Sequence, residues 1–260
     1  MRDVRRVLEG LGRTALLPFL TAGLPHPAES KGLFGAMADA GADGFEVGIP
    51  YSDPLMDGPV IMRGSELALA AGTTLEVAFS VVEEVASLGR PVLAMTYANP
   101  VMQTGWEKYC QRLAGCGAAG LIVPDLPLEE SGPLREAAQG AGIGLVLFVS
   151  PTTGAGRIEQ VAAADPAFIY GVADLGVTGE RSEVSQHVAG LSARVRGITN
   201  IPLVLGVGIS TPDQVRAVKV HADGLIVGTA LVRRVLDAPS AGDAARSLFE
   251  AVTALRSALN

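Results

Sequence analysis

Two acidic residues in one short stretch of the sequence have the types and the spacing that proton transfer requires. Glu46 lies inside the apolar run Phe45–Ile49, and Asp57 follows eleven residues later in an Asp-Gly-Pro turn. Burial among apolar side chains disfavours an ionised carboxylate, so the pKa of Glu46 is expected to rise. A carboxyl group of this kind can donate and accept a proton. We therefore expect Glu46 to act as a general acid and base, with Asp57 acting at the opposite end of a small substrate.

Structural roles compete with this interpretation. A buried Glu46 carboxylate can instead pair with an arginine or point to solvent, and Asp-Gly-Pro is common turn chemistry. The other titratable residues carry less information, because His26, His187 and His221 are scattered and fit surface or structural positions. The apolar runs contain no lysine, which argues against an aldolase that forms a Schiff base.

Two glycine turns near the end of the chain predict a phosphate site. Gly206-Val207-Gly208 and Gly228-Thr229 each follow an apolar run. Glycine lets backbone N–H groups approach an anion, and a helix that begins after the turn favours negative charge. A single Gly-x-Gly motif is weak evidence for a phosphate site, because any tight turn needs the same residues. Two glycine turns after neighbouring apolar runs are stronger evidence. Gly176–Gly179, on a long connection, adds a candidate flexible lid.

Eight short apolar runs must position these residues. They are separated by helical stretches and show little alternation, which is typical of parallel strands buried on both faces. Eight strand–helix units in 260 residues predict one α/β domain over residues 1–260, a (β/α)8 TIM barrel. A doubly wound sheet is the alternative, since periodicity cannot show closure. The runs are Ala15–Phe19, Gly44–Gly48, Val92–Thr96, Gly120–Val123, Leu145–Val149, Ala167–Tyr170, Leu203–Gly206 and Gly224–Val227.

Helix ends and loop lengths add detail to this barrel. Thr211-Pro212-Asp213 is typical of a helix start, and an apolar face recurs from Leu75 to Ala86. Two long connections, about 49–72 and 170–184, are expected at the carboxyl ends of the strands, where barrel active sites lie. Four glycines are expected to end helices: Gly41, Gly89, Gly117 and Gly142.

Composition excludes several classes of protein. The chain has 20 Lys+Arg against 27 Asp+Glu, a formal charge of −7, and 48% hydrophobic residues. It is too acidic for a nucleic-acid binder and too apolar for a disordered chain. No apolar run is long enough for a membrane span, and the charged start Met1–Arg6 predicts no secretory leader. Cys110 and Cys116 fit reduced core thiols of a cytoplasmic protein rather than a disulfide or zinc site.

Longer motifs resemble those of one known family. Pro18–Pro25 and Glu46–Pro59 resemble the opening motif and the signature of the tryptophan synthase alpha chain family, and residues 95–100, 124–127, 176–179 and 222–230 resemble its later blocks in the same order. The resemblance implies a barrel lyase that cleaves indole-3-glycerol phosphate into indole and glyceraldehyde 3-phosphate without metal or organic cofactor. It also implies a pyridoxal-phosphate-dependent beta chain as partner, in an α2β2 heterotetramer of tryptophan biosynthesis.

The resemblance assigns roles to individual residues. It implies that Glu46 protonates the indole carbon C3 and handles the glycerol hydroxyl, and that Asp57 accepts a hydrogen bond from the indole N–H. The substrate pocket that it implies comprises Phe19, Met95, Tyr97, Val149, Tyr170, Thr178 and Val207. The implied phosphate site comprises Gly179, Gly206, Gly208, Gly228 and Thr229.

Six positions depart from the family pattern; among them, Gly64 replaces a small residue that has a side chain, and Thr229 replaces a serine but keeps the hydroxyl. Met62, Leu67 and Ala173 stand where Gln, Arg and Ser are usual, and Val207 replaces a phenylalanine of the indole pocket. These changes affect pocket shape and coupling to a beta chain rather than Glu46 or Asp57. Two alternatives therefore stay open, an alpha-type paralogue that releases indole on its own and a subunit that mainly binds and activates a beta chain. Another phosphate-binding barrel, such as an isomerase, fits the long match less well.

Overall fold

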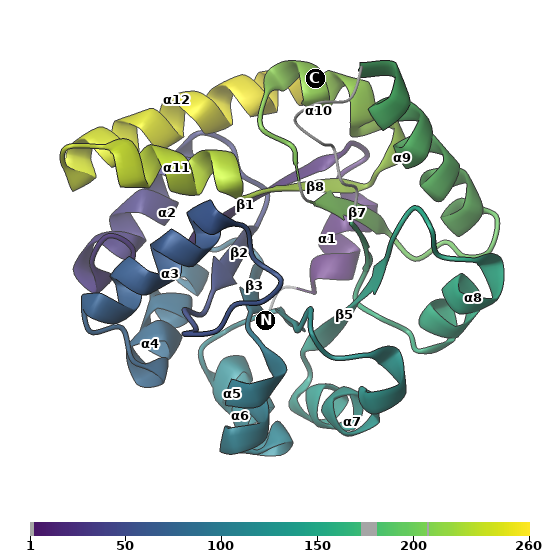
Figure 1. Cartoon of the computed structure of the whole chain (residues 1–260), viewed down its shortest axis with the longest axis horizontal. Coiled ribbons are helices and arrows are strands. Elements are labelled where there is room, and N and C mark those ends of the chain that lie inside the picture. Colours follow the sequence, from purple (N-terminus) through teal and green to yellow (C-terminus); the bar gives the residue numbers. More distant parts are fainter. Residues whose placement is uncertain (1–2, 173–180, 207) are drawn as a thin grey trace.

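Eight parallel strands form a closed barrel within the part of the chain that the computed structural model describes, residues 3–172, 181–206 and 208–260 (Figure 1). Each strand pairs with its neighbours in sequence, and β1 closes the ring against β8. This confirms the predicted barrel and rules out the doubly wound sheet. The strands are β1 (Ala15–Thr21), β2 (Phe45–Gly48), β3 (Val92–Met95), β4 (Gly120–Ile122), β5 (Gly144–Val149), β6 (Ile169–Val172), β7 (Leu203–Gly206) and β8 (Gly224–Val227).

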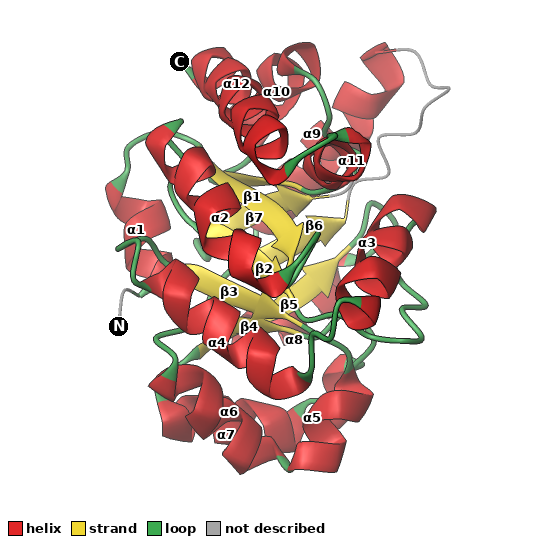
Figure 2. Cartoon of the chain, turned by 90° about the vertical axis from the view of Figure 1, so that its left-hand side faces the viewer, coloured by secondary structure: helices red, strands yellow, loops and turns green. Residues whose placement is uncertain are grey.

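Helices surround the strands on the outside of the barrel, except that α1 lies at the amino end of the barrel (Figure 1 and Figure 2). They are α1 (Val4–Gly10), α2 (Ser30–Asp39), α3 (Pro59–Ala70), α4 (Leu75–Ala86), α5 (Ala98–Thr104), α6 (Trp106–Gly115), α7 (Gly132–Ala141), α8 (Ala155–Ala163), α9 (Arg181–Arg196), α10 (Pro212–Val218), α11 (Thr229–Asp237) and α12 (Ala241–Leu259). Three short 3-10 helices complete the described elements: η1 (Pro27–Glu29), η2 (Leu128–Glu130) and η3 (Lys219–His221).

Local sequence signals explain where several helices begin and end. Helix α10 starts with a capping box, in which Thr211 and Gln214 each bond the other's backbone N–H. Helix α4 starts at the cap Thr74 and buries Phe79 and Val82 on its inner face. The four glycines predicted to end helices all have positive φ, and Gly142 ends α7 in the left-handed conformation. These predictions are confirmed.

The predicted long connection from Ile49 to Gly72 is wrong in one respect, because helix α3 occupies half of it. Pro59 at the first helical position and Gly58 before it start this helix, and Ile61 and Ala68 bury its inner face. The irregular segment is therefore only 49–58, which includes Asp57. In the second long connection, β6 continues to Val172 and α9 begins at Arg181, and residues 173–180 lie outside the described residues.

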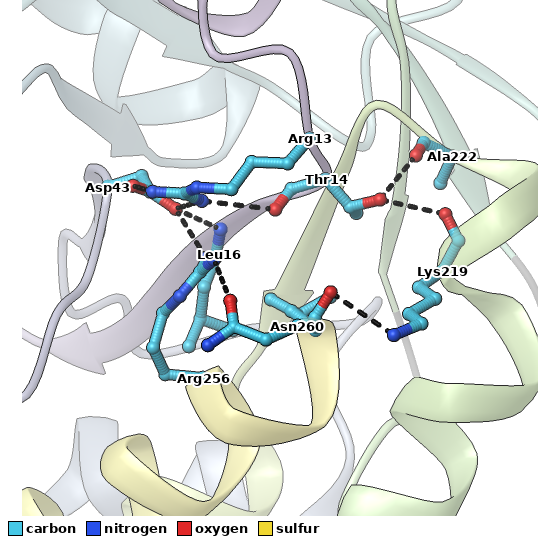
Figure 3. A network of polar contacts seen from close by, with 9 residues as sticks. Arg13, Thr14, Leu16, Asp43, Lys219, Ala222, Arg256 and Asn260 are labelled. Carbon is cyan, nitrogen blue, oxygen red and sulfur yellow. Dashed lines mark hydrogen bonds and ion pairs between the residues drawn. The ribbon is translucent and has the colours of Figure 1, made fainter.

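An ion-pair network around the buried Asp43 carboxylate lies at the amino end of the barrel (Figure 3). Asp43, whose side chain is 8% exposed, accepts two hydrogen bonds from Arg13 at 2.7 and 2.9 Å and one from the backbone N–H of Leu16 at 2.9 Å. Arg256 of α12 adds a fourth contact at 3.3 Å. The network therefore ties the last helix to the segments that enter β1 and β2, at the end opposite to Glu46 and Asp57.

Two further expectations concern the membrane and the cysteines. Among the described helices, none is long and apolar enough by itself to cross a membrane, and the pair α3 and α4, which together would reach that length, is bent by 109°. Cys110 and Cys116 are both buried free thiols, as the sequence predicts.

Candidate active site

A cavity of about 270 Å³ opens at the carboxyl end of the barrel and brings Glu46 and Asp57 together. Its wall is mostly apolar, and inward side chains from seven of the strands contribute to it. Such a shape, with a few converging polar groups, is typical of a small-molecule site. The described lining residues are Phe19, Glu46, Met56, Asp57, Gly58, Ile61, Met95, Ile122, Pro124, Phe148, Tyr170, Val172, Gly208, Ile209, Ile226, Gly228 and Thr229.

Glu46 is a buried carboxyl group, and no cation compensates its charge among the described lining residues. It is 3% exposed, and its Oε2 has no hydrogen-bond partner among the described residues. The described part of the cavity wall contains no Lys, Arg or His. Burial, and secondarily the charge of Asp57, raises the pKa of Glu46 to about 8. Glu46 is therefore protonated at neutral pH and can serve as an acid.

Asp57 stays an anion beside this acid. Burial raises the pKa of Asp57 to about 6, and a hydrogen bond from the hydroxyl of Tyr97 opposes that rise. Between pH 6 and 8 the cavity therefore holds one neutral carboxylic acid and one carboxylate. Two carboxyl groups whose environments separate their pKa values are the arrangement that divides acid and anion roles within one site.

The raised pKa of Glu46 predicts a pH-dependent stability. Below about pH 4.5 Glu46 is protonated in both the folded and the unfolded chain, but between pH 4.5 and 8 only the unfolded chain ionises it, so the free energy of unfolding falls as the pH rises. Glu46→Gln lacks this titration. We expect the variant to be more stable than the wild type by an amount that grows across this range and levels off above pH 8, on the order of 5 kcal/mol.

Urea denaturation of both proteins at pH 5, 6.5 and 8 measures this difference. A constant difference across the three pH values would show that Glu46 does not titrate between about 4.5 and 8 in the folded protein.

Phe148 forms an aromatic wall that the sequence reasoning missed. Phe148 pairs in register with Tyr170, and their ring centroids lie 5.0 Å apart, so both rings face the barrel interior. Val149, the predicted pocket residue, pairs with Gly171, where a Cβ atom would meet Leu191 of α9. Val149 therefore faces the helices. The alternation of side chains along a strand could have identified Phe148. Tyr170 faces inward, so the residue paired with it on β5, Phe148, also faces inward and Val149 faces outward.

The other predicted pocket residues divide into three groups. Phe19, Met95 and Tyr170 line the cavity, as do Asp57 and Glu46. Tyr97 is not among the lining residues, because its hydroxyl is turned to the segment that carries Asp57. Thr178, Gly179 and Val207 lie outside the described residues, as does Ala173.

The glycine turns meet at one end of the cavity, where β7 and β8 are neighbours. Gly208, with φ +81, Gly228 and Thr229 line it. Gly228 is the N-cap of α11, whose first turn contains no acidic residue, so N–H groups and the positive end of the helix are available to an anion. Gly206 does not line the cavity, and a Cβ atom there would lie 1.9 Å from the Tyr170 hydroxyl oxygen. Gly206 therefore makes room for that ring.

Two of the unusual residues, Met62 and Leu67, lie on α3, the helix that follows Asp57. Met62 is 38% exposed, whereas Leu67 is partly buried and packs against the core. The described part of the chain contains no group of three or more His, Cys, Asp or Glu side chains that could hold a metal ion.

Comparison with known proteins shows which family this chain resembles. A family model described as tryptophan synthase alpha chain matches residues 7–259. The tryptophan synthase alpha chain of Synechococcus sp. (strain CC9902) is 45% identical over 229 residues, which cover 87% of this chain and 85% of that protein. The alpha chain of Chloroflexus aurantiacus is 43% identical over 230 residues, which cover 88% and 86%.

Solved structures give the same result. The tryptophan synthase subunit alpha of Legionella pneumophila str. Paris superposes with a TM-score of 0.90 at 31% identity, covering 100% of this chain and 98% of that one. A chain of Mycobacterium tuberculosis tryptophan synthase superposes with a TM-score of 0.88 at 31% identity, covering 98% and 97%. The chain belongs to the tryptophan synthase alpha chain family.

Proposed function

We propose that this chain is an indole-3-glycerol-phosphate lyase that releases indole and glyceraldehyde 3-phosphate as an alpha subunit of tryptophan synthase. One observation carries the proposal: a neutral Glu46 carboxyl group and an Asp57 carboxylate share one apolar cavity. Apolar walls suit a flat aromatic ring, and the end formed by Gly208, Gly228 and Thr229 suits a phosphate.

The two carboxyl groups support a cleavage in two proton transfers. The Glu46 carboxyl group donates its proton to C3 of the indole ring, which places positive charge on the ring nitrogen, and the Asp57 carboxylate stabilises that charge through the indole N–H. The Glu46 carboxylate then accepts the proton of the neighbouring glycerol hydroxyl. The bond between C3 and the glycerol carbon breaks, its electron pair returns to the ring, and indole and an aldehyde result with Glu46 protonated again.

Indole release from indole-3-glycerol phosphate, assayed with and without a tryptophan synthase beta chain, tests this function. We expect release by the chain alone and faster release with the beta chain. Equal rates in both assays would favour the stand-alone indole-releasing lyase. No release in either assay, together with a faster beta reaction, would overturn the proposal in favour of a binding and activating subunit.

Exposed apolar side chains on the segment that carries Asp57 and on α5 support the beta-chain partner. Leu55 and Met56, on the segment that carries Asp57, are 89% and 63% exposed, and Met102 on α5 is 58% exposed. Exposed apolar side chains grouped beside a site are typical of a protein interface. We propose that a pyridoxal-phosphate-dependent beta chain covers these exposed side chains in an α2β2 complex. The two free thiols, Cys110 and Cys116, support a cytoplasmic location.

The phosphate site predicts a charge-dependent loss of binding at Gly228. We expect KM for the substrate to be about ten- to fifty-fold higher in Gly228→Asp than in Gly228→Asn. A carboxylate at this position repels the phosphate, and solvent screens that repulsion only in part. The asparagine variant is the matched control, since either side chain must also displace the Phe19 ring, 3.3 Å from a Cβ atom at this position. Equal KM values for the two variants, measured by indole release, would place the phosphate elsewhere.

A further inference from the structure

The hydroxyl of Tyr97 contacts the segment that carries Asp57. Its oxygen accepts a hydrogen bond from the backbone N–H of Met56 at 3.1 Å, and its interaction with the neighbouring Asp57 carboxylate lowers the pKa of Asp57. Tyr97 is 3% exposed and is not among the residues that line the cavity. Tyr97 is therefore placed to act on the substrate through Asp57 rather than by contact.

Further contacts fix Tyr97 and the segment relative to each other. The rings of Tyr97 and Tyr51 stack with centroids 5.3 Å apart and planes at 28°, and the side-chain amide of Asn99 donates to the Tyr51 hydroxyl at 3.0 Å. The backbone N–H of Ala98 donates to Asp125, after β4, at 2.8 Å. The start of α5 is thus anchored to the next strand and holds segment 49–58 at Tyr51, Met56 and Asp57.

The groups around Asp57 explain why the Tyr97 hydroxyl affects the protonation state of Asp57. Besides burial, the charge of Asp57 raises the pKa of Glu46 and of Tyr170, and the charges of Asp57 and Asp125 raise the pKa of Tyr97. Within the described residues, the groups that interact with Asp57 are therefore acids rather than cations. Burial further disfavours the Asp57 carboxylate, and the hydrogen bond from Tyr97 is the interaction that opposes it. Removing that bond should therefore favour the protonated form of Asp57.

We propose that Tyr97 is a positioning residue, which holds the segment that carries the Asp57 carboxylate in place at the cavity. The consequence for turnover rests on the proposed lyase function, but the effect on Asp57 itself does not. Tyr97→Phe keeps the ring and its stacking on Tyr51 and removes only the hydroxyl, so the barrel is expected to fold normally.

Titration of the chain with 13C-labelled aspartate carboxyl groups, followed by NMR, tests the effect on Asp57 directly. The Asp57 resonance is assigned by its loss in Asp57→Asn. We expect it to titrate near pH 6 in the wild type and about one unit higher in Tyr97→Phe. An unchanged midpoint would overturn the proposal, whether or not the chain cleaves indole-3-glycerol phosphate.

The pH profile of indole release separates this role from general structural support. In Tyr97→Phe we expect the acidic limb of kcat to move up by about one pH unit, with a several-fold loss at pH 6 and KM changed less than about two-fold. A uniform loss at every pH would indicate a structural role only. Tyr109→Phe is the matched control, since Tyr109 is a buried tyrosine of α6 that packs on Phe79 outside the cavity, and its profile should match the wild type.

If the wild-type chain releases no indole, the proposed function fails and the NMR titration alone decides the role of Tyr97. If the wild type is active but neither the titration nor the profile of Tyr97→Phe moves, the inference about Tyr97 fails while the lyase function stands.

Discussion

Replacing Glu46 by glutamine is expected to abolish nearly all indole release while the barrel stays folded. The amide is close to the carboxyl group in size and polarity, and at neutral pH the group that it replaces is uncharged, because burial raises the pKa of Glu46 to about 8. The amide cannot donate a carboxylic proton to C3 or take one back from the glycerol hydroxyl. Loss of general acid–base catalysis lowers rates by about 10²–10⁴-fold.

Steady-state indole release by Glu46→Gln, with thermal unfolding to verify the fold, measures this effect. Glu159→Gln is the matched control, because the same substitution is then made at an exposed position of α8. We expect the control to retain wild-type kcat and KM. A folded Glu46→Gln chain with near-wild-type turnover would remove Glu46 from the mechanism and leave its raised pKa as a consequence of burial alone.

The fold was predictable because each barrel strand must be apolar on both sides. β1 is buried at every position, and the predicted run Ala15–Phe19 lies inside it. Helix α3 was less evident, because Pro59 follows an Asp-Gly turn, and both Asp-Gly and Gly-Pro mark irregular segments as readily as they mark a helix start. The turn residues before Pro59 therefore favoured a loop in the prediction, although the inner face of α3 is apolar.

The candidate site was predictable where a residue type was chemically unusual for its surroundings. It was less predictable where the answer depended on which way a strand side chain points. A carboxyl group inside the apolar run at Glu46 is rare enough to be noticed, and the structure gives it the expected burial. Phe148 and Val149 are both apolar strand residues, and only the register with Tyr170 shows which one faces the cavity. The contact between Tyr97 and Met56 joins residues 41 positions apart, so no local pattern could reveal it.

Asp57 provides the second large effect, because it is the anion that the reaction needs beside the ring nitrogen. Asp57→Asn keeps the shape and an oxygen acceptor for the indole N–H but removes the charge. Substrate binding should therefore survive, with KM within a few-fold of the wild type. Stabilisation of the positive charge that develops on the ring should be lost, so we expect kcat to fall about 10²–10³-fold, the range found when one preorganised electrostatic contact is removed.

The residual activity of Asp57→Asn also reports on Glu46. The charge of Asp57 helps to raise the pKa of Glu46, so its removal should lower that pKa from about 8 and move the basic limb of the kcat profile to lower pH. The acidic limb, which follows the ionisation of Asp57 near pH 6, should disappear. Indole release measured from pH 5 to 9 tests both shifts. If binding were lost while bound substrate still turned over, Asp57 would be a binding residue, and the charge on the ring nitrogen would need another partner in this cavity.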